Sequence, residues 1–276
     1  MKIQILGSAA YERVPAMFCK CPACLQARKL GGKSIRTQAQ AFINDDLLID
    51  FGQDNYIHFL NNDRDYTKIQ NLLLTHDHAD HFMPNELRMT TSWFGKNDME
   101  PFGVWGNDFC KALYETNTSE KKCEYHLIEG FETFQAGIYT VTALPACHGK
   151  INALVYIISD GEKTILYNND TGFWRDDVYA FVKQKGFSFD FVVSDCTFCL
   201  EEGKTGISHM SLENNVVHRQ RLLEMNAVKE DTPWLITHYS HNGLVRDGRA
   251  VTPEELAEIA KSHGMIASYD GITFEI

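Results

Sequence analysis

The stretch with the strongest chemical signal is THDHADH, residues 75–81, which directly follows an apolar run of strand length. It holds four potential metal ligands within six residues: His76, His78, Asp80 and His81. A loop that leaves a strand can direct the alternate pair His76 and His78 at one metal ion, and Asp80 and His81 at a neighbouring ion. Imidazole and carboxylate donors together suit Zn²⁺ and also admit Mn²⁺ or Fe²⁺. The spacing therefore predicts a metal-binding loop rather than a polar turn that happens to be rich in histidine.

A second group of potential ligands is the cysteine trio of the segment CKCPAC: Cys19, Cys21 and Cys24. C-x-C-x-x-C is a ligand spacing, and three thiolates need a fourth donor to complete a tetrahedral structural zinc site. We favour His241 as this donor, because it lies three residues after His238 and a turn past the strand end can point the two rings at different metals. The alternatives are the unassigned histidines and the cysteines Cys110, Cys123, Cys147, Cys196 and Cys199.

The elements that must position these residues are predicted from apolar, β-branched runs that end in turn-forming residues. Such runs predict strands at 3–6, 40–43, 47–50, 71–75, 103–106, 139–144, 153–158, 164–168, 191–194, 234–237 and 272–276. Helices are predicted over 84–92, 211–226 and 253–263, the last with Thr252 as its N-cap.

The chain contains one internal echo, because LLLTH (72–76) and WLITH (234–238) are both apolar strands that end in Thr-His. Two halves that each deliver a histidine from a strand end would produce this echo, and open α/β sheets bind ligands at the carboxyl ends of their strands. No segment rich in Pro, Gly or Ser divides the chain. We therefore predict a single domain over 1–276, with a zinc-stapled loop at about residues 15–30.

The bulk composition limits the classes of partner. A net charge of −11 disfavours a protein that grips long nucleic acids, since phosphate binding relies on Lys and Arg. The apolar run in the N-terminal MKIQILGSAA is too short for a signal peptide. No apolar run approaches the roughly 20 residues of a membrane span. We expect a cytoplasmic protein that does not bind membranes. Its eight cysteines are then better interpreted as thiols or metal ligands than as disulfides.

The H-x-H-x-D-H string resembles the signature of the metallo-β-lactamase superfamily. The resemblance implies an α/β fold, an αββα sandwich of two mixed sheets flanked by helices, with a dinuclear metal site at the edge of the sheets. It also implies three further ligands in chain order, each after a strand. His148 in LPACHG would complete the first site, Asp170 in LYNNDTG would bridge the two metals, and His238 in LITHYSH would complete the second site.

Two more aspartates follow predicted strands, Asp50 in LLIDFG and Asp195 in VVSDCT. Asp50 partly matches the early Asp-x-Gly position of the superfamily. We expect each carboxylate to accept a hydrogen bond from a ligand imidazole and so to fix the tautomer of that ring. The alternative for both is an ordinary turn aspartate at a strand end.

The strings CKCPAC and THYSH together resemble one branch of that superfamily, the cyclic phosphodiesterases of the phosphonate-degrading (carbon–phosphorus lyase) pathway. This resemblance supports His241 as the fourth ligand of the structural zinc. It also implies a histidine without a metal ahead of a helix, for which GISHMSL offers His209. The chain departs from the branch in SAAYERVPA, where Tyr11, Glu12 and Arg13 replace the small residues of a glycine-rich turn.

These residues and the two resemblances together imply a metal-dependent phosphoric diester hydrolase with two catalytic divalent ions and one structural zinc. The catalytic ions would be Zn or Mn, with Fe and Ni as further options. A hydroxide that bridges the two ions would attack a small cyclic phosphodiester. Asp80 would hold one of the ions, and His209 would either protonate the departing alkoxide or bind phosphate.

Two alternatives remain open, a tRNA-processing endonuclease of the ribonuclease Z type and a non-catalytic, zinc-stapled carrier protein of cofactor biosynthesis. The first should carry a basic, Gly/Pro-rich arm, which the sequence lacks, and the second should have lost one of the seven ligands. The expected partner is a small phosphodiester and not a long nucleic acid. The resemblance also implies a homodimer.

Overall fold

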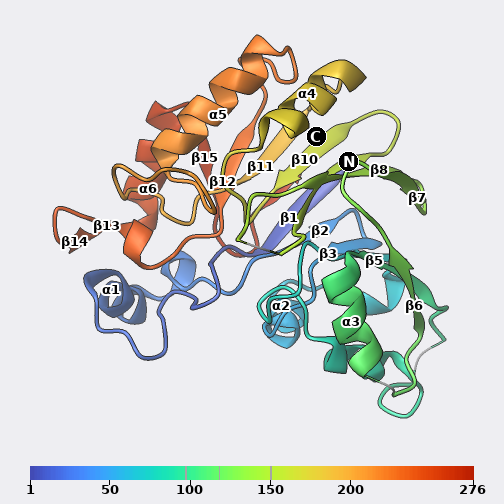
Figure 1. Ribbon diagram of the computed structural model, residues 1–276. Coiled ribbons are helices and arrows are strands. Elements are labelled where there is room, and N and C mark those ends of the chain that lie inside the picture. The colour runs from blue at the N-terminus through green and yellow to red at the C-terminus, as the bar shows by residue number, and fades with distance from the viewer. Residues whose placement is uncertain (97, 118, 150) are drawn as a thin grey trace.

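The computed structural model describes residues 1–96, 98–117, 119–149 and 151–276, and most of its strands lie in two sheets (Figure 1). The first sheet contains β1 (Lys2–Gly7), β2 (Gln40–Ile43), β3 (Leu47–Ile49), β4 (Asn71–Leu73), β5 (Phe102–Gly106), β6 (Cys123–Leu127) and β16 (Thr273–Glu275). The second contains β7 (Thr133–Ala136), β8 (Tyr139–Pro145), β9 (Leu154–Ser159), β10 (Thr164–Asn168), β11 (Phe191–Asp195), β12 (Trp234–Thr237) and β15 (Ile266–Ala267). A separate two-stranded sheet pairs β13 (Val245–Arg246) with β14 (Arg249–Ala250).

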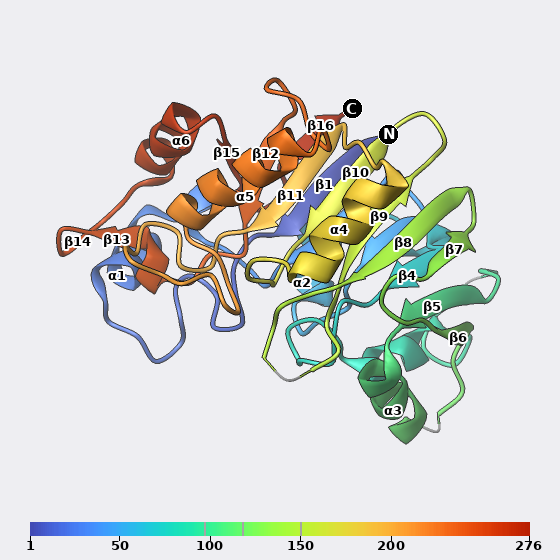
Figure 2. The same ribbon diagram turned by 45° about the horizontal axis from the view of Figure 1, so that its top comes forward.

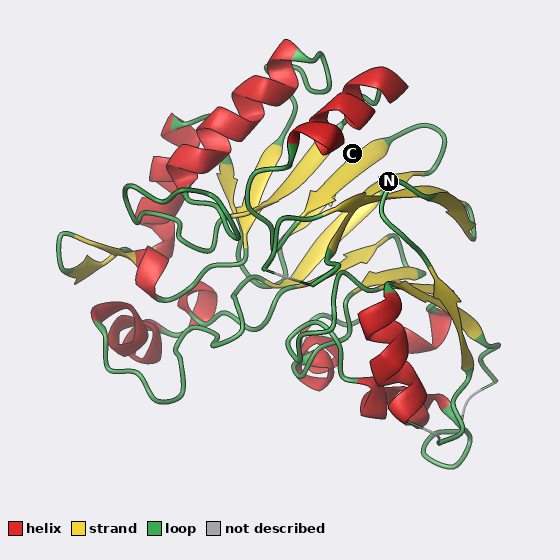
Figure 3. Cartoon of the chain, in the orientation of Figure 1, coloured by secondary structure: helices red, strands yellow, loops and turns green. Residues whose placement is uncertain are grey.

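Helices flank the pair of sheets, as Figures 2 and 3 show. The α-helices are α1 (Pro22–Leu30), α2 (Asn55–Asn61), α3 (Asp108–Thr116), α4 (Asp176–Lys185), α5 (Leu212–Glu224) and α6 (Pro253–Ser262). Short 3₁₀ helices span Gly32–Ser34, Tyr66–Lys68, Pro84–Thr90 and Asn242–Leu244. Buried residues of α4, α5 and α6 pack on the second sheet, and those of α3 pack on the first. The predicted αββα sandwich is confirmed.

The alternation of side chains along each strand explains the layers. In β10, Ile165 and Tyr167 belong to the core between the two sheets, whereas Leu166 between them packs under the helices. In β4, Leu73 likewise enters the core between the sheets, and Leu72 packs on the opposite face. Each central strand is therefore apolar on both faces, which is why these strands appear in the sequence as continuous apolar runs.

Each predicted strand coincides with an observed one, and the bounds of β2, β10 and β12 agree with the sequence pattern. The predicted helices at 211–226 and 253–263 correspond to α5 and α6, whose N-caps Ser211 and Thr252 both form capping boxes. The predicted helix at 84–92 is wrong in type, because the segment is a 3₁₀ helix that ends at Thr90. The hydroxyl of Thr91 donates to the carbonyl of Arg88 there, which competes with continued helix formation. No helix of the described residues is long and apolar enough to cross a membrane.

Helix α5 places His218 in the core beneath the second sheet. The ring is fully buried against Trp174 and Trp234, and its Nδ1 lies 2.7 Å from the hydroxyl oxygen of Tyr179. Burial, with a smaller contribution from Arg221, lowers the pKa of His218 to about 3. The folded protein therefore holds this histidine in its neutral form at physiological pH.

The free energy of unfolding should fall as the pH is lowered from 7 to 5. The unfolded chain binds a proton at His218 below about pH 6.5, whereas the folded chain does not, which gives about 2 kcal/mol at pH 5 for this residue. Denaturant unfolding of the wild type, of His218→Phe and of the exposed-histidine control His263→Phe measures this share. Only His218→Phe should show a flatter pH dependence, and equal slopes in all three proteins would contradict the assignment.

Candidate metal centre

The predicted ligands all follow the carboxyl ends of strands. His76 follows β4, His148 follows β8, Asp170 follows β10 and His238 follows β12. Strands β3 and β4 are parallel in the first sheet, and β10, β11 and β12 are parallel in the second. Parallel neighbours end at the same edge, so the loops that carry these residues meet at one edge of the sandwich.

The backbone at this edge is strained at three positions. Asp50, Asp170 and His238 have φ values of 65°, 53° and 66°, in the left-handed region that residues other than glycine seldom adopt. Such conformations persist where surrounding contacts over-determine them, and they gather at functional sites. Here they turn each side chain into the site directly after its strand.

The first group of donors consists of His76, His78, His148 and Asp170, whose ligand atoms all lie within 4.8 Å of one another. His78 Nδ1 lies 2.9 Å from His76 Nε2 and 3.3 Å from His148 Nε2. Asp170 Oδ2 lies 3.3 Å from His76 Nε2. Two nitrogen ligands of one tetrahedral zinc ion lie about 3.3 Å apart, since each Zn–N bond is about 2.0–2.1 Å. The observed spacing therefore fits a single small cation.

The second group consists of Asp80, His81, His238 and again Asp170, within the same 4.8 Å limit. His81 Nε2 lies 3.1 Å from Asp80 Oδ2 and 3.0 Å from Asp170 Oδ2. His238 Nε2 lies 3.6 Å from the same Asp170 oxygen. Asp170 thus belongs to both groups, as the predicted bridging carboxylate must. The structure brings all seven predicted ligands together, while their roles as ligands stay a prediction.

The charges of the site fit two divalent cations. Asp50, Asp80, Asp170 and Asp195 are at most 3% exposed, and within the described part of the chain their ion-pair partners are all histidines. Buried charges need compensation, which only protonated imidazoles or bound cations can supply here. Among the described residues, four buried atoms of the site contact other ligand atoms but have no hydrogen-bond partner: Asp80 Oδ1, Asp170 Oδ1, His81 Nε2 and His238 Nε2. Unpartnered lone pairs that converge in this way suit metal coordination.

The neighbouring charges set the protonation states of the donors. Burial favours a raised pKa for Asp170, but His238, His209 and His81 outweigh it and hold the pKa well below its usual range. Burial lowers the pKa of His76 well below its ordinary value, whereas the carboxylates of Asp80 and Asp50 overcome burial at His81 and raise its pKa. Asp170 is therefore ionised and His76 neutral, as metal binding requires, and a cation would replace the proton of His81.

Two aspartate–threonine pairs orient the imidazoles through their Nδ1 atoms. The sequence pattern did not predict either threonine. Thr75 Oγ1 donates to Asp50 and lies 3.0 Å from His76 Nδ1, while Asp50 Oδ2 lies 2.7 Å from His81 Nδ1. Thr197 Oγ1 likewise donates to Asp195 and lies 2.8 Å from His238 Nδ1. With Nδ1–H directed at these oxygens, each Nε2 is left with its lone pair toward the donor groups.

His209 lies beside Asp170, the residue that both groups share, and close to His238 of the second group. Its Nδ1 lies 3.0 Å from Asp170 Oδ1, 3.2 Å from Asp195 Oδ2 and 3.1 Å from Thr197 Oγ1. Burial opposes protonation of this ring, but the carboxylates of Asp195 and Asp170 raise its pKa to about 10. His209, Asp195, Asp170 and His238 also satisfy the 4.8 Å criterion as a third possible donor set. Whether His209 acts without binding a metal, as predicted, is therefore tested by counting the metal ions of a His209 variant.

The cysteine motif forms a separate group around the start of α1. Cys21 is the N-cap of that helix and Pro22 occupies its first turn, so the helix N-terminus favours thiolates beside it. His241 Nδ1 lies 3.3 Å from Cys21 Sγ and 3.7 Å from Cys19 Sγ. Cys24 completes the set within 4.8 Å, and burial raises the pKa of its thiol to about 12. The structure thus places His241 with the three cysteines, whereas Cys196 and Cys199 lie in the hydrophobic core.

We expect Cys24→Ser to release one tightly bound zinc ion and to lower the melting temperature, because structural zinc binding is coupled to folding. His241→Ala should have the same effect, and the matched control Cys123→Ser should keep the zinc. Metal analysis by mass spectrometry and thermal melts measure both quantities. If His241→Ala leaves them unchanged while Cys196→Ser removes the zinc, the fourth ligand is Cys196.

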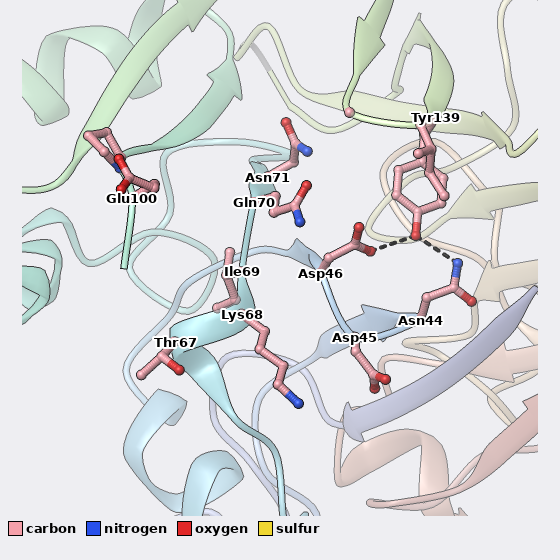
Figure 4. Close-up of a pocket in the computed structure, with 13 residues that line it drawn as sticks. Asn44, Asp45, Asp46, Thr67, Lys68, Ile69, Gln70, Asn71, Glu100 and Tyr139 are labelled. Atoms are coloured by element: carbon pink, nitrogen blue, oxygen red, sulfur yellow. Dashed lines mark hydrogen bonds between the residues drawn. The ribbon is translucent and has the colours of Figure 1, made fainter. Parts of the chain in front are cut away.

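A cavity of about 640 Å³ opens over the metal-binding groups. It is lined by site residues together with Tyr11, Glu12, Phe198, Glu201 and Lys204. A larger cavity of about 870 Å³ lies elsewhere, around Tyr139, Asp46 and Asn71 (Figure 4). Asn71 begins β4, so this second cavity lies at the opposite end of the strand that delivers His76, and no histidine or cysteine lines it among the described residues.

Comparison with known proteins agrees with the αββα fold that carries these groups. The family model described as the beta-lactamase superfamily domain matches residues 46–229. The search of curated proteins gave no match. Similar solved structures include a diphosphatase from the PhnP family, which is 19% identical with a TM-score of 0.73 over 100% of this chain and 97% of its own. Zn²⁺-bound PqqB from Methylobacterium extorquens is 18% identical, with a TM-score of 0.73 over 100% of both chains. Human tRNase Z, short form, is 15% identical, with a TM-score of 0.64 over 100% of this chain and 99% of its own.

Proposed function

Because the chain belongs to the beta-lactamase superfamily and is a metal-dependent hydrolase, we propose that it hydrolyses a small phosphodiester with two divalent metal ions. The observation that carries the proposal is the shared carboxylate of Asp170, which lies between the two donor groups. A carboxylate shared in this way would hold two ions close together, as two-metal hydrolysis of phosphate esters requires.

The donor chemistry favours phosphate esters over β-lactams. The second group holds Asp80, His81 and His238 and no thiol. Cys147 precedes His148, but its thiol is not part of either group. The backbone N–H of Cys147 donates to Thr171 Oγ1. Two divalent ions at these groups would acidify water and neutralise the charge of a phosphate group.

The chain's own residues would then handle the leaving group. His209 lines the cavity, and while its Nδ1 faces Asp195 and Asp170, its Nε2 makes no hydrogen bond within the described residues. This nitrogen is the one available to a leaving alkoxide or to a phosphate oxygen. Asp195 and Thr197 hold the ring in place, so the proton donor is positioned before the substrate arrives.

The cavity argues against long nucleic acids as substrates. Lys204 is the one lysine or arginine among the described residues that line it, and its Nζ is paired with Glu201 Oε2 at 2.8 Å. A tRNA-processing enzyme would need a cationic surface along the RNA backbone. A non-catalytic carrier would not need the complete second donor group.

The proposal is tested with a hydrolysis panel on enzyme of defined metal content. The panel comprises cyclic nucleotides, cyclic ribose phosphate, bis-p-nitrophenyl phosphate and a precursor tRNA. Turnover of small diesters without tRNA cleavage is expected. Cleavage of the tRNA alone would favour the endonuclease, and an inactive protein with a full metal complement would overturn the proposal.

A further inference from the structure

The turn at residues 10–13 forms one wall of the cavity over the metal-binding groups. Tyr11 and Glu12 line this cavity together with His148 and Asp170. This is also the segment in which the sequence departs from the small residues of the resembling branch. Side chains that protrude from such a turn reduce the room above the metals and change its charge, so the turn is placed to select among substrates.

The turn is held rigidly by contacts on both sides. The backbone N–H of Ala10 donates to the carbonyl of Tyr239 at 3.0 Å, and Gln38 Nε2 donates to the carbonyl of Tyr11 at 2.9 Å. Arg13, in the left-handed conformation with φ of 68°, pairs with Asp54 at 2.8 Å. A wall residue on a rigid turn can contact a ligand without a large cost in ordering.

The carboxylate of Glu12 is fixed through one of its oxygens. Ser240 Oγ donates to Glu12 Oε1 at 2.6 Å, and His241 Nε2 lies 3.9 Å from the same oxygen. The other oxygen, Oε2, makes no hydrogen bond to the described residues, and the side chain is 33% exposed. Glu12 therefore lines the cavity with one oxygen left free to accept a hydrogen bond, from a position next to His241 of the cysteine–histidine group.

The charge of Glu12 is not balanced by a lysine or arginine in the described part of the chain. Arg13 pairs with Asp54, and Lys204 pairs with Glu201. A sphere of the cavity's volume is roughly 11 Å across, and the Debye length at physiological ionic strength is about 8 Å. A second phosphate on the side of the cavity nearest to Glu12 would thus be repelled by its carboxylate, whereas hydroxyl groups there could donate to it.

We propose that Glu12 is a specificity-determining residue, which accepts hydrogen bonds from hydroxyl groups of the leaving group and disfavours substrates that carry a second phosphate. This inference rests on the proposed phosphodiesterase function, and it narrows the substrate to a singly charged, hydroxyl-bearing diester. A buried or half-buried acceptor that loses its hydroxyl partner, or that meets an anion instead, discriminates strongly between ligands of similar size.

The test compares two ligand pairs that differ only by a phosphate. Adenosine 2′,3′-cyclic phosphate with a 5′-hydroxyl or a 5′-phosphate serves for kinetics. Adenosine 3′-monophosphate and adenosine 3′,5′-bisphosphate serve for calorimetric binding to the metal-loaded protein. We expect the wild type to prefer the 5′-hydroxyl member of each pair. Glu12→Gln should lower the KM and the Kd of the 5′-phosphate member of each pair about tenfold and leave kcat unchanged. Glu202→Gln, which removes the same charge from an exposed residue outside the cavity, should leave the preference unchanged.

The outcomes separate this inference from the proposed function. If neither these cyclic phosphates nor the other diesters of the panel are hydrolysed but Glu12→Gln still shifts the binding ratio, the phosphodiesterase assignment fails and the selectivity of Glu12 stands. If the ratios of the wild type and Glu12→Gln are equal, the inference is overturned. The inference would also be overturned if Glu12→Gln lost one zinc ion and bound both members of a pair more weakly by the same factor. That result would assign Glu12 to the cysteine–histidine group.

Discussion

Asp170→Ala should lose at least one of the two catalytic metal ions and, with it, phosphodiester hydrolysis. Asp170 is the one residue that belongs to both donor groups, and its oxygens lie 3.0–3.6 Å from five imidazoles. Removing a residue that only orients a ligand typically costs about 10–100-fold in metal affinity or activity. Loss of a carboxylate shared by two ions should exceed that range, because geometry and charge compensation disappear together.

The measurement is metal content by mass spectrometry, with initial rates on bis-p-nitrophenyl phosphate. The exposed aspartate control Asp231→Ala should match the wild type in both. The cysteine-bound zinc should remain in Asp170→Ala, because Asp170 is not one of the four residues of that group. A variant that keeps two catalytic ions and full activity would show that Asp170 does not bridge them.

His209→Ala should keep all the metal ions and lose about 10²–10⁴-fold in rate, the usual contribution of a positioned general acid. The residue lines the cavity, and Asp195, Asp170 and Thr197 surround its Nδ1. The loss should be largest for cyclic ribose phosphate, whose alkoxide needs a proton to depart. It should be smaller for bis-p-nitrophenyl phosphate, because p-nitrophenolate leaves without one.

Three other results would assign His209 differently. A lower metal count would make it a ligand, which the short contact to Asp170 also permits. Equal losses on both substrates would make it a phosphate-binding residue. An unchanged rate would leave it as an ordinary loop histidine. The control His263→Ala removes an exposed histidine at the end of α6 and should not affect either substrate.

Much of this site could be predicted from the sequence because its ligands are rare residue types that directly follow apolar strands. The echo between LLLTH and WLITH proved to be one strand from each sheet, β4 and β12. The spacing of His76, His78, Asp80 and His81 is local, so a single loop determines it. The position of Cys21 ahead of Pro22 likewise encodes the start of α1.

Other features could not be predicted, for identifiable physical reasons. Thr75 and Thr197 orient imidazoles, yet a threonine after a strand is common and carries no spacing signal. The left-handed backbone of Asp170 and His238 depends on tertiary contacts. Strands β6 and β7 are half-exposed edge strands without an apolar run, so periodicity does not mark them. The placement of Glu12 beside Ser240 joins residues that are 228 positions apart.

The most direct test of the central claim is the rate of bis-p-nitrophenyl phosphate hydrolysis as metal ions are returned to the stripped chain. Two donor groups that share Asp170, with a separate cysteine–histidine group, predict full activity only at about three metal ions per chain. Activity should rise with the ions that follow the first, tightly held zinc. A chain that saturates at one metal ion and hydrolyses nothing would contradict a dinuclear hydrolase and favour the zinc-stapled carrier.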